Sequence, residues 1–180
     1  MVGVSFCAGA LAAVALNLAL VPGAAAAAPE AAEVAGGVLP AGAATAILAV
    51  HNRERAAVGV APLRWDGALA ASALACARSL ASAGQFRHCG LGENLWMGAT
   101  GRFGAAQMAE LWAAERRLFQ PGLFPAVSRS GNWQDVGHYT QMVWRATTAV
   151  GCGAAAGADG RTRLVCHYAP PGNIDGRPVF

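Results

Sequence analysis

The feature that most constrains this chain is a short run near its C-terminus, residues 137–147, which reads GHYTQMVWRAT. An imidazole, a phenol, a thioether and an indole stand close together in it. His138 follows a glycine, and the apolar residues at 142–144 come after it. Such a pattern is typical of a short helix that buries one side and presents its first residues to a cleft. We therefore expect a helix over 137–145, with His138 beside a cavity.

Two further runs accompany this one: LVCHYAPPGNI at 164–174 and GENLW at 92–96, with His88 just before the latter. Together the runs resemble the CAP superfamily, also called the SCP/TAPS or pathogenesis-related-1 family. GHYTQMVWRAT is similar to the first signature of that family, and CHYAPPGNI to the core of its second. The run HNRERAAVGVAPLRWDGALAASA, residues 51–73, resembles the family's opening helices. Several matches in the right order, spread over roughly residues 45–176, are more specific than any single motif.

The resemblance implies a three-layer α-β-α sandwich, and the local patterns agree with it. Helices and strands follow one another without a strict βαβ rhythm, which favours an α+β domain over a doubly wound one. Asp66 is a good N-cap for the second helix. The expected elements are helices over 43–57, 66–81, 104–119 and 137–145, a loop or short strand within 85–101, and strands over 149–155 and 162–168.

The N-terminal part indicates export. Residues 2–21 form an uncharged apolar run, and small residues that offer A-x-A sites follow it. We expect a signal peptide over 1–28, a flexible lead-in over 29–42 and one domain over 43–180. No Lys or Arg precedes the run, so an uncleaved anchor is the competing interpretation, because about 20 apolar residues can span a bilayer. After cleavage no membrane span would remain, and the product would be secreted, either outside the cell or into a periplasm.

Composition excludes several functions. The formal net charge of +3 is too small for a dedicated nucleic-acid-binding protein, and no basic block accompanies it. All 13 basic residues are Arg, so a lysine nucleophile or Schiff base is excluded. We expect a monomer without a nucleic-acid partner.

The cysteines predict a disulfide framework. Cys7 would leave with the signal peptide, and the four that remain are an even number in an exported chain with three pairings open to them. We favour the two short loops, Cys76–Cys89 and Cys152–Cys166. The second pair flanks a predicted hairpin, where a cross-strand bridge is geometrically easy, and the family resemblance supports it. Free buried thiols and a zinc site are the alternatives, although neither pair is spaced as C-x-x-C.

The resemblance also implies a site in which two histidines and two acidic residues line a central cleft. Carried over residue by residue, they are His88, Glu93, Glu115 and His138. Neutral imidazoles are zinc ligands, so His88 and His138 are candidates to hold Zn²⁺ or another divalent metal. The two carboxylates could orient the imidazoles through their second N–H, or one of them could act as a base beside a metal-bound water.

Each of these residues also has a purely structural interpretation. Glu93 could satisfy buried loop amides, Glu115 could form a surface ion pair, and each histidine could be an ordinary hydrogen-bonding residue. Of the other histidines, we expect His51 to be structural and His167 to lie on the opposite side of its strand from Cys166; both stay outside the predicted site. Asn94 is expected to tie loop amides together. Most of the indoles are expected in the core, and Trp133 is expected to rim the cleft.

The first functional hypothesis is a secreted binding module for a sterol, another lipid or a surface partner, with a cleft that can take a divalent metal. The alternative is a metal-dependent, peptidase-like hydrolase with Glu93 or Glu115 as base. The H-E-x-x-H and G-x-S-x-G motifs of common hydrolases are absent from the sequence. A third hypothesis is a surface module with a vestigial cleft.

Overall fold

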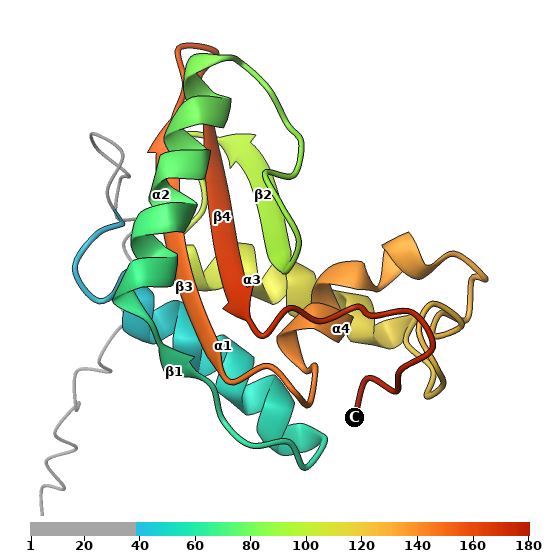
Figure 1. Ribbon diagram of the computed structural model, residues 1–180. Coiled ribbons are helices and arrows are strands. Elements are labelled where there is room, and N and C mark those ends of the chain that lie inside the picture. Colours follow the sequence, from blue (N-terminus) through green and yellow to red (C-terminus); the bar gives the residue numbers. More distant parts are fainter. Residues whose placement is uncertain (1–38) are drawn as a thin grey trace, which may run out of the picture.

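The computed structural model describes residues 39–180 (Figure 1). The predicted signal peptide and nearly all of the predicted lead-in lie outside the described residues. Between residues 39 and 180, none of the helices has the length and apolar character that crossing a bilayer requires.

The centre of the domain is a four-stranded mixed sheet with the strand order β1-β3-β4-β2. The strands are β1 (Arg64–Trp65), β2 (Glu93–Ala99), β3 (Ala149–Ala156) and β4 (Arg161–Ala169). β1 runs parallel to β3, and the other two pairings are antiparallel. The predicted hairpin is therefore present as β3–β4. The segment expected to be a loop or short strand contains the full-length edge strand β2. The two-residue strand β1 was not predicted, because so short a run carries no periodic signal.

One face of the sheet is covered by helix α2 (Gly67–Ser82), which lies across β3 and β4 (Figure 1). Its start matches the prediction, since the side chain of Asp66 accepts the backbone N–H groups of Ala68 and Leu69. The helix approaches the β3 backbone very closely at Gly151 and Gly153. A Cβ atom on Gly153 would lie 2.4 Å from the Cα atom of Leu74. The glycines of β3 therefore set the spacing of this layer.

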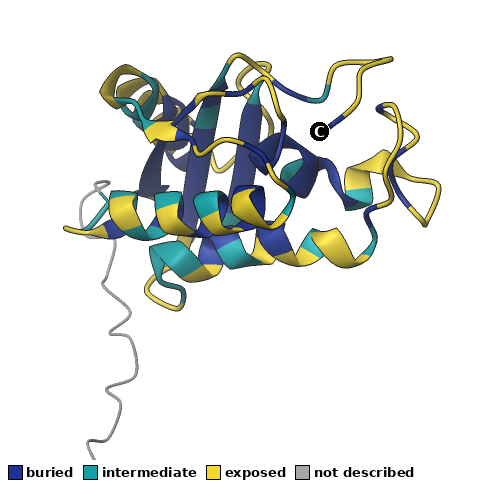
Figure 2. Ribbon diagram, turned by 90° about the horizontal axis from the view of Figure 1, so that it is seen from below, coloured by how far each residue is buried: buried dark blue, intermediate teal, exposed yellow. Residues whose placement is uncertain are grey.

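The other face is covered by α1 (Ala43–Ala57), α3 (Ala105–Ala113) and the short α4 (Gly137–Met142). Because side chains alternate along a strand, Leu164 and Cys166 of β4 enter the larger core on this side, whereas Val165 packs under α2. Figure 2 shows the buried strands between helices whose outward faces are exposed. The fold is thus the expected α-β-α sandwich.

The third helix differs from the prediction. It ends at Ala113 rather than 119 and continues as a 3-10 helix over Ala114–Arg117. The buried stripe runs through Met108, Ala109 and Trp112, so Leu111 lies beside the stripe and is 49% exposed. The tighter turn ends the helix just before Phe119, whose ring packs into the core against Tyr139.

A buried arginine fixes the end of α4 against α1. The Arg55 side chain is almost inaccessible to solvent and makes no ion pair with any carboxylate between residues 39 and 180. Its guanidinium group instead donates to backbone carbonyls of Ala61, Met142, Trp144 and Thr147. The planar fork of donors suits such a set of carbonyls. The segment that carries His138 is thereby held at its C-terminal end.

The close approach of α2 to β3 gives a stability prediction. Gly153→Ala should lower the free energy of unfolding by about 1–3 kcal/mol, because the new methyl group must displace helix backbone. Gly67→Ala is the matched control, since a Cβ there meets nothing within 4 Å. Urea unfolding should show the loss only for Gly153→Ala. Equal stability of the two variants would contradict the packing described.

Candidate functional site

A cleft of about 700 Å³ opens between the segment preceding β2, the start of α4 and the C-terminal segment. Its polar lining includes both predicted histidines together with amide side chains, and its apolar lining comes from the segments before β2 and around α4. The lining includes His88, Leu91, Glu93, Asn94, Phe124, Pro125, Trp133, His138, Gln141 and Asn173. Of the four predicted site residues, three line this cleft. Glu115 does not, and it lies behind His138.

His138 is held by Glu115 and Trp112. Its Nδ1 atom lies 2.6 Å from Oε1 of Glu115, and the indole of Trp112 stacks on the imidazole with ring centroids 5.8 Å apart. The other carboxylate oxygen of Glu115 accepts the backbone N–H groups of His138 and Tyr139. Glu115 therefore caps the start of α4 and orients the ring at the same time. The 3-10 turn that ends α3 places it there.

His88 is held in the same way by Glu93. Its Nδ1 atom lies 2.8 Å from Oε1 of Glu93, and the imidazole is 57% exposed while the carboxylate is fully buried. The carboxylate also accepts the backbone N–H of Cys89. Burial alone would raise the pKa of Glu93, but hydrogen bonds from His167, His88 and Cys89 outweigh it and lower the pKa to about 2. The same hydrogen bond raises the pKa of His88, against the opposing effect of burial.

The two pairs share one chemical consequence. A carboxylate on Nδ1 makes that nitrogen the donor, so the neutral ring carries its lone pair on Nε2. Within residues 39–180, no protein group is hydrogen-bonded to Nε2 of His88 or His138. A histidine whose other nitrogen donates to a carboxylate is the usual arrangement of a metal-binding histidine. The donor set of the cleft is thus compatible with a divalent metal.

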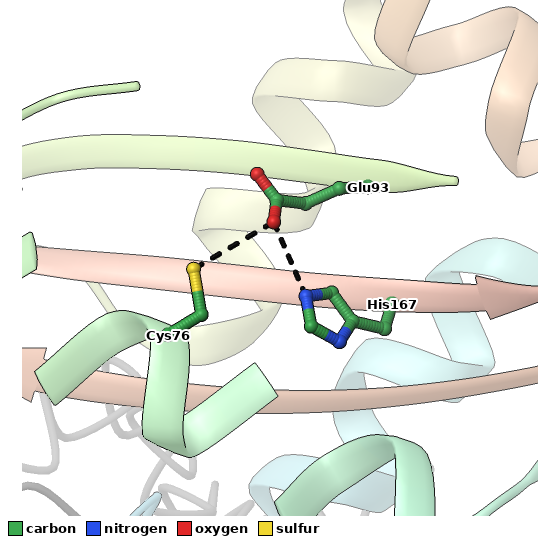
Figure 3. Close-up of side chains that lie close together, drawn as sticks. All are labelled: Cys76, Glu93 and His167. Carbon is green, nitrogen blue, oxygen red and sulfur yellow. Dashed lines mark hydrogen bonds and ion pairs between the residues drawn. The ribbon is translucent and has the colours of Figure 1, made fainter. Parts of the chain in front are cut away.

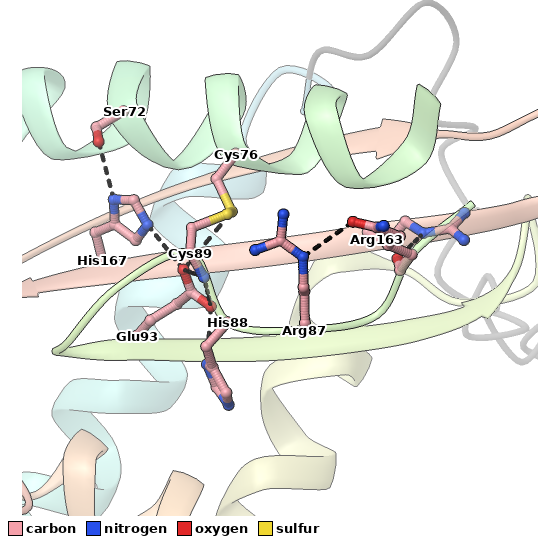
Figure 4. The surroundings of a disulfide bond; sticks show 9 residues. Ser72, Cys76, Arg87, His88, Cys89, Glu93, Arg163 and His167 are labelled. Carbon is pink, nitrogen blue, oxygen red and sulfur yellow. Dashed lines mark hydrogen bonds and ion pairs between the residues drawn. A yellow bond between two sulfur atoms is a disulfide. The ribbon is translucent and has the colours of Figure 1, made fainter. Parts of the chain in front are cut away.

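His167 contacts Glu93 although the sequence placed it outside the site. It faces α2, as strand alternation predicted, but it is the cross-strand partner of Glu93. Its Nε2 atom lies 3.1 Å from Oε2 of Glu93, and its Nδ1 atom lies 3.1 Å from Oγ of Ser72. Figure 4 shows the carboxylate between His167 under α2 and His88, which points away from α2. Only the register of β2 against β4 could have revealed this contact.

The structure contains both of the favoured disulfides, Cys76–Cys89 and Cys152–Cys166. The sulfur of Cys76 lies 3.6 Å from Oε2 of Glu93, and together with His167 these residues form a group that could hold a metal (Figure 3). In the disulfide, Cys76 carries no proton and cannot donate to the carboxylate. The sulfur is not a thiolate either, so in this state the group lacks one of its ligands.

A buried polar network connects the cleft to the core. Nδ2 of Asn94 donates to the backbone carbonyl of His138 and to the hydroxyl of Tyr168, which also bonds Nε2 of His51. His51 is thus structural, as predicted, and burial lowers its pKa to about 4, so the ring is neutral. Asn94 was expected to bond loop amides. Instead its side chain joins β2 to α4.

The apolar side of the cleft is formed by aromatic and aliphatic groups. Trp133 is 40% exposed and rims the cleft, as predicted, with its ring edge-on to Phe124 at a centroid distance of 5.2 Å. Leu91 and Pro125 extend this apolar side. The prediction that the other indoles lie in the core is confirmed for Trp96, Trp112 and Trp144, whereas Trp65 is only partly buried.

An α-β-α sandwich of this topology, with a cleft between the start of α4 and the segment preceding β2, belongs to the CAP/SCP class of domains. Residues 48–168 match the model of the cysteine-rich secretory protein family, CAP. Since that match covers more than half of the chain, this chain is a member of the family.

Individual relatives and solved structures agree. The chain is 41% identical over 133 residues to pathogenesis-related leaf protein 4 of Solanum lycopersicum. The aligned region covers 74% of this chain and 80% of that protein. It is 37% identical over 135 residues to pathogenesis-related protein 1C of Nicotiana tabacum, with 74% and 78% covered. The crystal structure of NaASP2 with Zn²⁺ is similar at a TM-score of 0.63 and 25% identity, with 79% and 86% covered. The crystal structure of hookworm platelet inhibitor has the same fold, with a TM-score of 0.64 and 18% identity. The match covers 79% of this chain and 76% of that one.

The His88–Glu93 hydrogen bond gives a pH prediction. Because the carboxylate stabilises the imidazolium, the pKa of His88 should lie above 6.5 and should fall toward 6.5 in Glu93→Gln. The bond therefore stabilises the fold most below pH 6.5 and loses this contribution as the pH rises through the folded pKa. NMR titration of the imidazole protons measures this, with His51 as the internal control. An unchanged His88 titration in the variant would contradict the assigned pair.

Proposed function

We propose that this protein is an exported binding module whose cleft holds a divalent metal, most suitably Zn²⁺, on Nε2 of His88 and His138. The observation that carries the proposal is the pair of matched histidine–carboxylate bonds beside one cleft. Two imidazoles leave coordination positions for water or a ligand oxygen. Glu93 and Glu115 would fix the tautomers and raise the basicity of the rings. The structure of NaASP2 with Zn²⁺ supports the choice of metal by similarity.

Export is supported by the two disulfides, which persist in oxidising compartments. The uncharged apolar run at 2–21 supports the same conclusion from the sequence. The chain would act outside the cytosol, in a compartment where these disulfides persist.

The ligand that suits this cleft is a lipid with an anionic or polar head. Trp133, Phe124 and Pro125 offer an apolar surface on one side, and the metal with the half-buried side chain of Asn173 offers polar partners on the other. A pocket with a mostly apolar lining and a few placed polar groups is the usual form of a small-molecule site. A carboxylate head on the metal and a hydrocarbon chain along the aromatic side would satisfy both.

A metal-dependent hydrolase is the less supported alternative. A general base needs a free lone pair and a pKa near the working pH. Glu93 is fully buried, is committed to several hydrogen bonds and has a pKa near 2. Glu115 accepts three hydrogen bonds from α4 and does not line the cleft. Both carboxylates are better suited to orienting a histidine than to taking a proton from water.

Zinc titration of the full chain tests the metal. Wild type should bind one Zn²⁺ in its oxidised state, and Glu115→Gln should bind it about 10–100-fold more weakly, the usual cost of losing a partner of a metal ligand. The double variant His88→Ala/His138→Ala should lose more than that. Ser72→Ala is the matched control: it removes a hydroxyl that bonds His167 but touches neither of the two ligands nor their carboxylates, and it should keep the affinity. Equal binding by wild type and the double variant would refute the site.

The same proteins test the ligand. Zinc-loaded wild type should bind a long-chain fatty acid more tightly than its methyl ester, because only the acid offers a carboxylate to the metal. Calorimetry should show this preference disappear in the double variant. Equal binding of acid and ester would assign the cleft a purely apolar role, and no binding of either would exclude a lipid of this type.

A further inference from the structure

Three potential ligand atoms converge on the α2 side of Glu93, away from the cleft (Figure 3). Oε2 of Glu93 lies 3.6 Å from Sγ of Cys76 and 3.1 Å from Nε2 of His167, and all three atoms lie within 4.8 Å of one another. In a tetrahedral zinc site, bond lengths of about 2.0–2.3 Å place neighbouring ligand atoms about 3.3–3.6 Å apart. Only small side-chain adjustments therefore separate this group from zinc-binding geometry.

Two of the three atoms, those of His167 and Glu93, are already oriented by a neighbour. Ser72 bonds Nδ1 of His167, which directs Nε2 toward the carboxylate. The serine hydroxyl can accept as well as donate, so it can hold the tautomer whose Nε2 carries a lone pair. On Glu93 the other oxygen, Oε1, bonds His88 and leaves Oε2 on the α2 side. Cys76 is nearly buried on α2 and cannot move far. Such outer contacts are what orient metal ligands in proteins.

The Cys76–Cys89 disulfide controls whether Cys76 can act as the third ligand. Disulfide sulfur is a poor ligand, whereas a thiolate binds zinc strongly. Cys89 lies in an exposed loop, but Cys152 and Cys166 are both buried, so a reductant reaches the Cys76–Cys89 bond more readily. Figure 4 shows this disulfide joining the loop to α2 beside His167.

We propose that reduction of Cys76–Cys89 creates a zinc site formed by Cys76, Glu93 and His167. A dithiol reductant breaks the S–S bond, is itself oxidised to a disulfide, and leaves two thiols on the protein. Zn²⁺ then displaces the Cys76 proton to solvent and compensates the adjacent negative charges of thiolate and carboxylate. The fourth position goes to water or to the freed Cys89. This site is distinct from the cleft site and shares only Glu93 with it, because it uses the other oxygen of that carboxylate and neither His88 nor His138.

Cobalt titration of the full-length Cys89→Ser variant tests the proposal, because that change frees Cys76 without any reductant. Co²⁺ should give a thiolate-to-cobalt charge-transfer band that equimolar Zn²⁺ removes. Wild type treated with a dithiol, and shown to gain two thiols per chain, should give the same band, and oxidised wild type should not. The reduced wild type keeps the test valid should the variant fold poorly.

Cys76→Ser is the matched control, because it also frees one thiol of this disulfide, that of exposed Cys89, and it should give no such band. Adding His167→Asn to Cys89→Ser should abolish the band, and adding Ser72→Ala should weaken Zn²⁺ binding about tenfold. The His138→Ala change, which removes a cleft ligand but no contact of this group, should leave the band intact, so failure here is distinguishable from failure of the cleft site. No band in Cys89→Ser and reduced wild type, or an equal band in Cys76→Ser, would overturn the proposal.

Discussion

The structure depends on a buried chain of hydrogen bonds that begins at His51 in α1 and ends at the backbone of His138 in α4. Nδ1 of His51 donates to the carbonyl of Ile47, so its Nε2 accepts from the hydroxyl of Tyr168. That hydroxyl in turn accepts from Asn94, whose amide also bonds the His138 carbonyl. Every donor has one acceptor, which is the condition under which a buried polar network stabilises a unique packing. The network joins α1 to α4 through β4 and β2. It thereby fixes the position of the His138 backbone beside the cleft.

At the edge of the sheet, Glu93 holds the other cleft histidine, His88, in position. It stands at the first position of β2, faces α2, and reaches one histidine on each side of the strand. Its carboxylate is ionised and buried, so losing either partner would leave a poorly compensated charge in a dry environment. This explains why the loop that carries His88 is anchored at two adjacent points, the Cys89 backbone and the Cys76–Cys89 disulfide. The position of His88 is thus set by its hydrogen bond to the buried, ionised carboxylate of Glu93.

Local patterns predicted much of this from the sequence. The helix that presents His138, the Asp66 cap and the β3–β4 hairpin each depend on residues close together in the chain. The family resemblance supplied the four predicted site residues. Three of them line the cleft, and Glu115 lies behind His138. What could not be predicted depends on long-range geometry. Examples are the register that places Glu93 opposite His167, and the 3-10 turn that puts Glu115 behind His138.

Zinc anomalous diffraction from crystals of the oxidised chain tests the central claim, that two histidines oriented by carboxylates form one metal-ready cleft. We expect a single strong peak about 2.0–2.1 Å from Nε2 of both His88 and His138, with no sulfur in contact. A peak bound to only one of these rings, a peak elsewhere on the protein, or none at saturating zinc would contradict it.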